Sequence, residues 1–408
     1  PTTRGSFYSC LLILGQFKAA FTYTLISEGE GMDKREEFEQ LLFATKINSL
    51  CSKEEAQSKI KKLQEWIIAN IPDRLYRFRS NTDYAIDALE KDQIWGSTLW
   101  EFNDPYECIP FFDEEILKKS IENEESYKQL IQIVRSLQHD ITPNWFGEVY
   151  GEKISRQIIE NVKKNLDENE IKENYELMKQ WIKGFIQRNS SCIVNQFFTG
   201  ILQAESQRHI VCLSERNDST LMWGHYANGH RGFCIEYDFK SILEPCQTNC
   251  CDIKGCNNFM LIPSIAPVVY NKSRFDATSH LAAVIQADII YESQADINVY
   301  HEDTLLISKC LLTKSSDWDY EKEWRLFSPP STPPIEPHKA IYSLKPMAVY
   351  IGSRSSVEQD QKLSEICKKK NIPCYKMVQN YYGDDFKVFP MLYDDYTKGA
   401  STKINELV

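Results

Sequence analysis

Residues 208–239, RHIVCLSERNDSTLMWGHYANGHRGFCIEYDF, contain the pattern from which the fold can be worked out. The segments HIVCLSE and GFCIEYDF are apolar and rich in β-branched or aromatic residues, as is typical of strands. Between them, STLMWGHYA has helical spacing, and Asn228 and Gly229 close it because both residues accept left-handed backbone. This segment therefore predicts a strand, a short helix and a second strand in quick succession.

The same pattern extends outward in both directions. Upstream, RLYRFRS (74–80) alternates like a strand, TDYAIDALEKDQ (82–93) has the period of a helix, and QIWGSTLW (93–100) predicts another strand. Downstream, we expect strands in APVVYN (266–271), YEKEWRLFS (320–328) and AVYIGS (348–353), and helices around 279–291, 302–313 and 356–370. This mixed order predicts the α+β class, with a mixed, mostly antiparallel sheet.

One elaborated domain is preferred to two, because no internal repeat or low-complexity linker divides the chain. Residues 32–73 predict two helices, in segments 36–47 and 56–71, and Pro72 ends the second. The core covers 74–355 with a helical insertion at about 114–190, and 356–408 adds a helix and strand elements to the same domain. Residues 1–31 are interpreted as an upstream extension or an artificial leader, because Met32 opens a polar segment like a natural start.

Composition indicates a folded protein and excludes some partners. The chain has 408 residues, of which 42% are hydrophobic and 26% charged, which is typical of soluble globular proteins. A formal charge of -11 argues against a broad nucleic-acid surface, which needs clustered Lys and Arg. The apolar run near the N-terminus is interrupted by Gln16 and Lys18, whereas a membrane span takes roughly 20 apolar residues. We therefore expect no membrane partner.

The 13 cysteines are an odd number and lie mostly alone in apolar runs, so we expect reduced thiols in a cytoplasmic protein. Four of them form a C-x3-C-C-x4-C cluster: Cys246, Cys250, Cys251 and Cys256. Structural zinc prefers paired hooks separated by a longer interval, so this cluster is an imperfect zinc site. We expect no metal in the mechanism.

The segment WDYEKEWRLF (318–327) carries the densest charge of any candidate strand. On a strand, Glu321, Glu323 and Arg325 would share one face, and the two carboxylates would lie roughly 6 to 7 Å apart. At that spacing one carboxylate can act on a sugar carbon while the other orients a nucleophile. A solvated strand edge, or a helix in which Glu321 pairs with Arg325, explains the same pattern.

Two nearby segments offer groups that could hold a ligand. Arg77 and Arg79 share one face of the RLYRFRS strand, and the planar fork of arginine suits a diphosphate, although surface arginines on strands are common. In WGST, Ser97 and Thr98 supply hydroxyl groups beside Gly96, where a ligand could approach closely. A strand that simply ends in a turn is the alternative for WGST.

The segment FNDPYE (102–107) predicts a rigid loop. Asn103 and Asp104 can bind the backbone of their own turn, and Pro105 fixes its entry. At the end of a strand, such a loop could line a pocket in which Asp104 or Glu107 grips a ligand or an arginine. A purely structural turn is the alternative.

The segment LMWGHYANGH (221–230) places aromatic side chains around a histidine. Trp223 and Tyr226 could stack on a flat base, and His225 could act as a hydrogen-bond partner or a proton carrier. A histidine packed in the core explains the pattern as well.

Four of these motifs, LYRFRS, FNDPYE, the segment from CLSERNDST to GFCIEYDF, and WDYEKEWRLF, occur in the order seen in a largely bacterial family. The chain resembles this family, domain of unknown function 2971, over about residues 74–355. The resemblance implies no established activity. It implies a cytoplasmic protein with a role as a toxin or in antiviral defence.

The chain is also similar, more weakly, to ADP-ribosyltransferases, whose small split sheet binds NAD. That similarity implies that Arg77 holds the pyrophosphate and that Ser97 and Thr98 support the nicotinamide ribose. It also implies that Glu323 is the catalytic carboxylate and that Glu321 steers the attacking group. NAD would then be the substrate, in a hollow shared by Arg77 and Glu323, and a macromolecule not defined by the sequence would be the acceptor.

Two other functions fit the same residues. Asp104, Glu107 and Glu323 could hold Mg²⁺ or Mn²⁺ in a nuclease or phosphodiesterase, although few basic residues are available for a polyanion. A non-enzymatic sensor or interaction protein, with the aromatic motifs as core, is the third hypothesis. The sequence contains no P-loop, Rossmann, nucleophile-elbow or zincin motif.

Overall fold

A computed structural model describes residues 33–48, 51–121, 208–243, 264–282, 303–328, 340–379 and 386–399, and the single positions 156, 160, 180 and 184. The predicted leader, the four clustered cysteines and most of the predicted insertion lie outside the described residues. Within 114–190, the structure describes the helix α5 (Glu114–Ile121) and the four single positions.

Eight strands form one continuous sheet in the order β12-β11-β10-β4-β1-β3-β8-β5. Only the β10–β11 pair within it is parallel, so the predicted α+β class with a mostly antiparallel sheet is confirmed. The strands are β1 (Leu75–Arg79), β3 (Ile210–Ser214), β4 (Phe233–Tyr237), β5 (Ile265–Pro267), β8 (Glu323–Phe327), β10 (Ala348–Ile351), β11 (Cys374–Gln379) and β12 (Val388–Leu392). Because this sheet is continuous, the described strands do not show the split sheet that the similarity to ADP-ribosyltransferases implied.

Two small sheets lie beside the large one, and both interrupt strands that the sequence predicts as longer. APVVYN divides at Val268: β5 stays in the large sheet, whereas β6 (Val269–Asn271) pairs in parallel with β7 (Thr313–Ser315). QIWGSTLW forms only the short strand β2 (Gln93–Trp95), which pairs with β9 (Ala340–Ser343), and then the 3-10 helix η2 (Leu99–Glu101). Local alternation therefore predicts the strands better than it predicts their partners.

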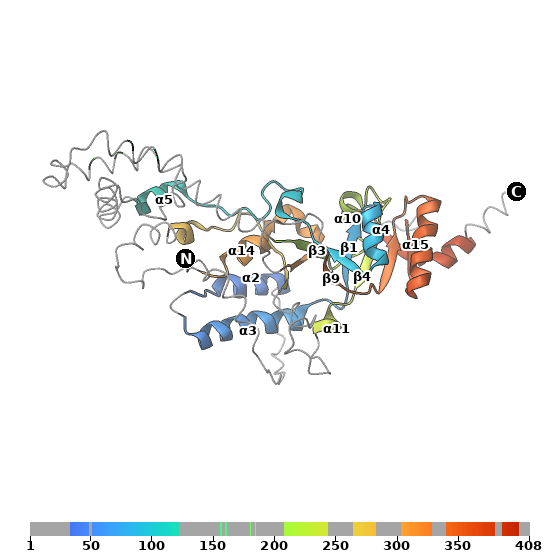
Figure 1. The fold of residues 1–408 in the computed structure, drawn as a ribbon, viewed down its shortest axis with the longest axis horizontal. Coiled ribbons are helices and arrows are strands. Elements are labelled where there is room, and N and C mark those ends of the chain that lie inside the picture. The colour runs from blue at the N-terminus through green and yellow to red at the C-terminus, as the bar shows by residue number, and fades with distance from the viewer. Residues whose placement is uncertain are drawn as a thin grey trace.

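Helices lie against the strands (Figure 1). Capping residues and helix breakers in the sequence mark where these helices begin and end. Ser52 caps α3 by accepting a hydrogen bond from the Glu55 backbone, and α3 ends two residues before Pro72. The described helices besides α5 include α2 (Lys34–Ala44), α3 (Lys53–Asn70), α4 (Asp83–Glu90), α10 (Thr220–Tyr226), α11 (Lys240–Leu243), α14 (Leu306–Leu312) and α15 (Val357–Lys370), and residues 278–282 and 393–399 are helical as well. In the described part of the chain, none of the helices combines the length and the apolar character that crossing a membrane requires.

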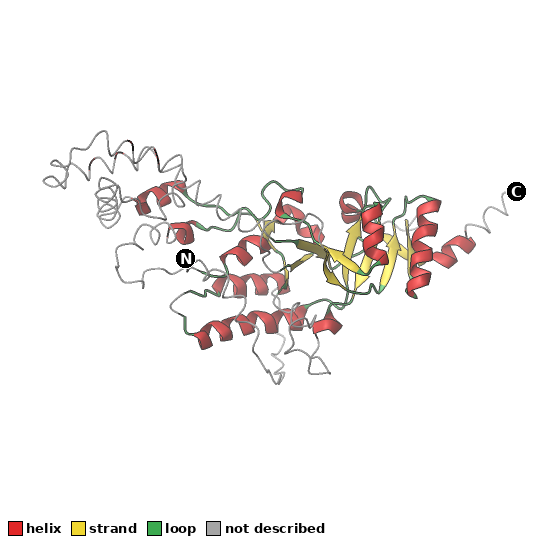
Figure 2. Cartoon of the chain, in the orientation of Figure 1, coloured by secondary structure: helices red, strands yellow, loops and turns green. Residues whose placement is uncertain are grey.

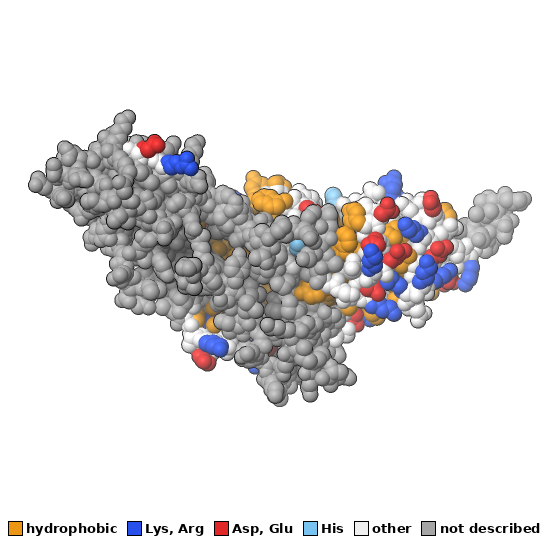
Figure 3. Space-filling view, viewed as in Figure 1, with side chains coloured by type: hydrophobic (Ala, Val, Ile, Leu, Met, Phe, Trp, Pro, Cys, Tyr) orange, Lys and Arg blue, Asp and Glu red, His pale blue; other side chains and the backbone are white. Residues whose placement is uncertain are grey.

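The large sheet is covered on both faces, as the flanking helices in Figure 2 indicate. One face, which we call the core face, packs against α2, α3, α4 and α15 through residues such as Val211, Ile235 and Val349. The other, which we call the α10 face, packs against Trp223 of α10 through Phe78 and Cys234. Over α4 and α15, acidic and basic side chains interleave on the surface shown in Figure 3.

The connection from α10 to β4 requires glycine at a point of close backbone contact. A Cβ atom on Gly232 would lie 2.1 Å from the Arg79 carbonyl oxygen and 3.0 Å from the Ala227 Cα. Both neighbours are backbone atoms, which cannot rotate away. This contact fixes α10 against the end of β1.

We expect Gly232→Ala to lower the free energy of unfolding by about 2 kcal/mol, because the new methyl group forces a backbone shift. Gly224→Ala is the matched control: a methyl group at this position would have no atom within 4 Å, and alanine favours the helix. Urea unfolding of both variants would check this. Equal stability of the two variants would contradict the close contact at Gly232.

Candidate active site

A group of five charged side chains lies buried beside the α10 face, and we call it the ion cluster: Glu107, Lys314, Glu321, Glu323 and Arg325. The Lys314 Nζ lies 2.6 Å from Glu321 Oε2, 3.1 Å from Glu323 Oε2 and 3.4 Å from Glu107 Oε2. Arg325, which is fully buried, donates from Nε to Glu323 Oε1 over 2.8 Å and from Nη2 to Glu107 Oε1. Each cation therefore joins carboxylates from different parts of the chain.

Four structural elements bring these groups together. Glu107 comes from the FNDPYE loop, Lys314 from β7, and Glu323 with Arg325 from β8. Glu321 ends the 3-10 helix η6 (Ser316–Glu321), and Lys322 then turns the chain with a φ of 44°. The prediction that Glu321 lies on the strand is therefore wrong, because the left-handed turn at Lys322 separates it from β8. The turn nevertheless leaves both carboxylates on Lys314.

The ion cluster has three carboxylates and two cations, so one negative charge remains when all five groups are ionised. Burial and the neighbouring Glu323 raise the pKa of Glu321 to about 7. Burial alone would raise the pKa of Glu323, but Arg325 and Lys314 hold it well below its usual range. The pair therefore divides into a carboxylate that stays ionised and one that exchanges a proton near neutral pH.

Four aromatic side chains lie together, and one of them, Tyr226, contacts Glu321. We call them the aromatic rim: His225, Tyr226, Trp318 and Tyr320. The Tyr226 hydroxyl donates to Glu321 Oε1 over 2.6 Å. The exposed His225 ring lies 6.3 to 6.4 Å from the other three rings. Burial and Glu321 raise the pKa of Tyr226, so its hydroxyl remains a donor.

The FNDPYE loop serves both parts of the site. Asp104 Oδ1 accepts from the Tyr106 backbone over 2.8 Å, which forms the predicted turn. Glu107 grips Arg325, as one of the two alternatives predicted, and Asn103 lies 3.4 Å from the Tyr226 hydroxyl. The turn therefore holds one residue in the ion cluster and another at the aromatic rim.

The structure does not bring Arg77 to the ion cluster. Glu323 pairs with Ser214, and Ser214 pairs with Tyr76, so these three side chains share the α10 face. Side chains alternate along a strand, so Arg77 points to the core face. There it is buried, donates to the Trp95 carbonyl, and has its pKa lowered to about 9 by burial and by Arg79. The prediction that Arg77 and Glu323 line a common hollow is therefore wrong.

The other residues predicted for the nucleotide site have structural partners. Trp223 is fully buried and donates to the Asn217 carbonyl over 2.6 Å, so it belongs to the core. The Thr98 hydroxyl binds Glu101 in the cap of η2. Ser97 bridges to Ile210 through its backbone. Arg79 lies over the ring of Tyr84 at 5.6 Å.

Sequence reasoning missed Lys314, on which three carboxylates converge. It follows the apolar segment LISKCLL and belongs to no recognisable motif. Lys309, inside that segment, is also buried and forms a separate pair with Asp303. The sequence signal that could have indicated a buried lysine was its position in or beside an apolar run. That signal does not distinguish Lys314 from Lys309.

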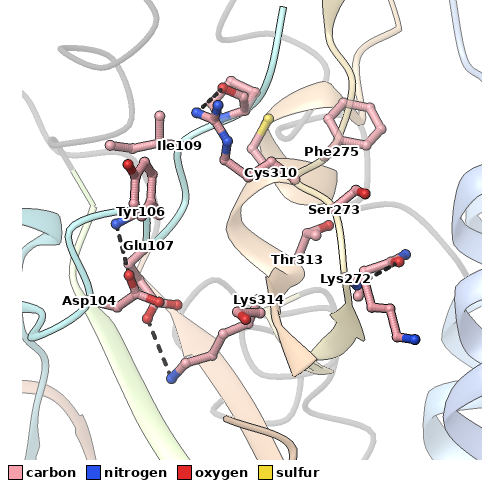
Figure 4. Close-up of a pocket in the computed structure, with 14 residues that line it drawn as sticks. Asp104, Tyr106, Glu107, Ile109, Lys272, Ser273, Phe275, Cys310, Thr313 and Lys314 are labelled. Carbon is pink, nitrogen blue, oxygen red and sulfur yellow. Dashed lines mark hydrogen bonds and ion pairs between the residues drawn. The ribbon is translucent and has the colours of Figure 1, made fainter. Parts of the chain in front are cut away.

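A cavity of about 270 Å³ opens beside the ion cluster (Figure 4). Asp104 and Glu107 of the FNDPYE loop line one side of the cavity (Figure 4). Lys272 and Arg274, on the turn after β6, also contribute to its lining. Lys314 lies at the cluster end, where it meets Glu107. The ion cluster therefore has an open side as well as a buried one.

The carboxylates of the ion cluster are poorly suited to a metal ion. Lys314 and Arg325 already occupy the positions between Glu107 and Glu323 from which a cation would be coordinated. Among the described residues, no group of three or more His, Cys, Asp or Glu side chains has metal-binding geometry. Asp104, the third ligand in the nuclease hypothesis, instead binds its own turn.

Comparison with known proteins finds a family model that matches part of the chain. Residues 222–326 match the model of a family described as Protein of unknown function (DUF2971). This match confirms the family predicted from the motifs, and it contains every residue of the ion cluster except Glu107. No curated protein and no solved structure matches the chain.

Proposed function

We propose that this protein is an enzyme that cleaves the bond between nicotinamide and ribose in NAD and transfers the ADP-ribosyl group to a nucleophile. The observation that carries the proposal is the carboxylate pair in the ion cluster. Glu323 stays ionised, and Glu321 exchanges a proton near neutral pH beneath an aromatic rim. Enzymes that cleave glycosidic bonds usually use two carboxyl groups with different pKa values.

The reaction needs negative charge beside the ribose and a group that takes one proton. The carbon–nitrogen bond breaks with its electron pair going to nicotinamide, which leaves an oxocarbenium-like ribose. An ionised Glu321 stabilises that cation more than it stabilises the ground state. As the oxygen of the attacking hydroxyl bonds to the ribose carbon, its proton passes to Glu321. The rings of the aromatic rim provide stacking surfaces for the leaving base.

The contacts favour Glu321 over Glu323 as the reacting group. Glu323 is bound by Arg325 and Lys314 behind the cluster. Glu321 shares Lys314 with Glu323 but has no contact with Arg325, and its Oε1 accepts a hydrogen bond from the Tyr226 hydroxyl at the aromatic rim. Glu323 is then a positioning residue that keeps Lys314 and Arg325 in place. This exchanges the roles that the similarity to ADP-ribosyltransferases implied.

The rate of NAD cleavage should rise with pH around neutrality. Glu321 acts in its ionised form, and with a pKa of about 7 that form is scarce at pH 6 and dominant at pH 8. We expect roughly tenfold faster cleavage at pH 8 than at pH 6. Nicotinamide release measured across this range would check the profile. A rate that is flat or falls with pH would contradict an ionised Glu321 as the reacting form.

The direct test is incubation of the purified full chain with NAD labelled on the adenosine half, with and without a cell lysate. We expect nicotinamide release in both, and a labelled macromolecule only where the lysate supplies an acceptor. No release of nicotinamide in either sample, across the pH range above, would refute the proposal. Cleavage that depletes cellular NAD or modifies a cellular target would also account for a toxin or defence role.

A further inference from the structure

The left-handed turn at Lys322 decides where both carboxylates of the pair lie. Its φ of 44° and ψ of 53° are uncommon for a residue with a Cβ atom, because that atom then crowds the backbone. Glu321 precedes the turn and Glu323 follows it, and both side chains reach Lys314. Such a conformation persists only where the surrounding structure holds it. The contacts that hold this turn therefore also place the reacting carboxylate.

Three residues from other parts of the chain bind the backbone of this turn. The Lys322 carbonyl accepts a hydrogen bond from the Glu215 backbone, directly after β3, over 3.1 Å. The Glu323 backbone donates to the Tyr270 hydroxyl, on β6, over 2.7 Å. The Glu323 carbonyl accepts from the Val268 backbone, between β5 and β6, over 2.9 Å. The turn is therefore held from the end of β3 on one side and from the β5–β6 connection on the other.

Arg35, in the first turn of α2, contacts all three of these residues. Its Nη1 donates to the Val268 carbonyl over 2.7 Å and to the Glu323 carbonyl over 3.0 Å. Its Nη2 donates to Glu215 Oε1 over 2.5 Å, and the guanidinium lies 5.5 Å from the ring centre of Tyr270. The Arg35 side chain is only 11% exposed, so water competes little for these contacts. The planar guanidinium fork therefore joins both sides of the turn, which the point charge of an ammonium group does not reproduce.

We propose that Arg35 is a positioning residue for the reaction, because it fixes the turn that carries Glu321 to Lys314 and Tyr226. This role rests on the proposed function, in which Glu321 is the reacting group. The contacts of Arg35 lie on the Glu323 side of the turn, so it acts on Glu321 through the backbone. Because α2 precedes residues 222–326, this support comes from a part of the chain that the family match does not cover.

Steady-state cleavage of NAD by the full chain with Arg35→Gln tests this role. We expect kcat to fall by roughly tenfold to a hundredfold, which is the usual effect of a displaced reacting group. The KM for NAD should stay nearly unchanged, because Arg35 supports the turn and not the substrate. Arg35→Lys should recover only part of the rate, since an ammonium group replaces one of the contacts. Lys34→Gln, at the exposed neighbouring position on α2, is the control matched for charge.

A second variant separates the turn from general stability, because Arg35→Gln also leaves the Glu215 carboxylate without its cation. Glycine adopts positive φ without the crowding of a Cβ atom, so the turn then depends less on Arg35. Lys322→Gly in the Arg35→Gln background should therefore regain roughly fivefold in kcat. The rates are compared at a temperature where circular dichroism shows every variant folded. A kcat in this double variant no higher than in Arg35→Gln would count against the turn as the route by which Arg35 acts.

Amide hydrogen exchange tests the hold on the turn without relying on catalysis. In Arg35→Gln, the amides of residues 322–327 should exchange about tenfold faster or more, whereas those of α15 should not change. Faster exchange in a protein that does not cleave NAD would support the hold on the turn and remove the proposed reaction. Cleavage of NAD with the same kcat in Arg35→Gln and the unaltered protein, or unchanged exchange at residues 322–327, would overturn the role of Arg35.

Discussion

Replacing Glu321 by Gln slows NAD cleavage by about a hundredfold or more, because general base catalysis typically contributes that much. The amide keeps the shape of the side chain but neither takes the proton of the attacking hydroxyl nor stabilises the oxocarbenium-like ribose. It still accepts a hydrogen bond from the Tyr226 hydroxyl. Nicotinamide release by the purified variant, measured at pH 8 where Glu321 is ionised, gives the result.

The fold should survive this change. The raised pKa of Glu321 shows that the folded protein tolerates its neutral form, and the amide is a neutral mimic of that form. We expect the free energy of unfolding to change by less than about 1 kcal/mol. Glu365→Gln, an exposed position on α15, is the control for the charge change. A Glu321→Gln protein that cleaves NAD at the unaltered rate would assign the reaction to another group.

The Tyr226→Phe variant distinguishes the proposed role of Glu321, which accepts the proton, from that of Tyr226, which only hydrogen-bonds to Glu321. Loss of the hydroxyl removes one hydrogen bond to Glu321, which is typically worth about 1 kcal/mol, and leaves the carboxylate in place. The rate should therefore fall much less than in Glu321→Gln. It should also keep its rise with pH, whereas any residual rate of Glu321→Gln should not show that rise.

The sequence predicts the strands of the large sheet well where alternation is strong. RLYRFRS, HIVCLSE and GFCIEYDF become β1, β3 and β4, and their patterns reflect packing that is largely local. The same alternation does not place Arg77 correctly. A ligand-binding role needs an open face, but β1 lies in the middle of a sheet that is covered on both faces. Neighbouring strands decide that coverage, and a single segment does not encode it.

The ion cluster was predicted in part. Glu107, Glu321, Glu323 and Arg325 stood out because charged residues lay among aromatic ones, and the structure brings all four together. The role of Lys314 depends on the pairing of β7 with β6 outside the large sheet, which is a non-local event. The left-handed turn at Lys322 could not be predicted from the sequence either, because lysine is not a residue type that indicates positive φ.

Replacing Arg325 by Met lowers the free energy of unfolding by about 3 to 5 kcal/mol, which is the usual effect of removing one partner from a buried ion pair. Arg325 is fully buried and contacts Glu107, Glu323 and the Leu311 carbonyl. Methionine fills much of the same volume, so the loss is mainly electrostatic: Lys314 alone then faces three carboxylates. Urea unfolding of the variant measures the effect.

A second replacement distinguishes this charge effect from a packing defect. Glu107→Gln removes one of the carboxylates that Arg325 neutralises, so in the Arg325→Met background it should restore stability rather than reduce it further. The double-mutant cycle should give a coupling of about 1 to 3 kcal/mol. Arg216→Met, which breaks an exposed pair with Asp218, should cost less than about 1 kcal/mol. Additive losses at Arg325 and Glu107 would mean that the two residues stabilise the protein independently, and that the ion cluster does not act as one electrostatic unit.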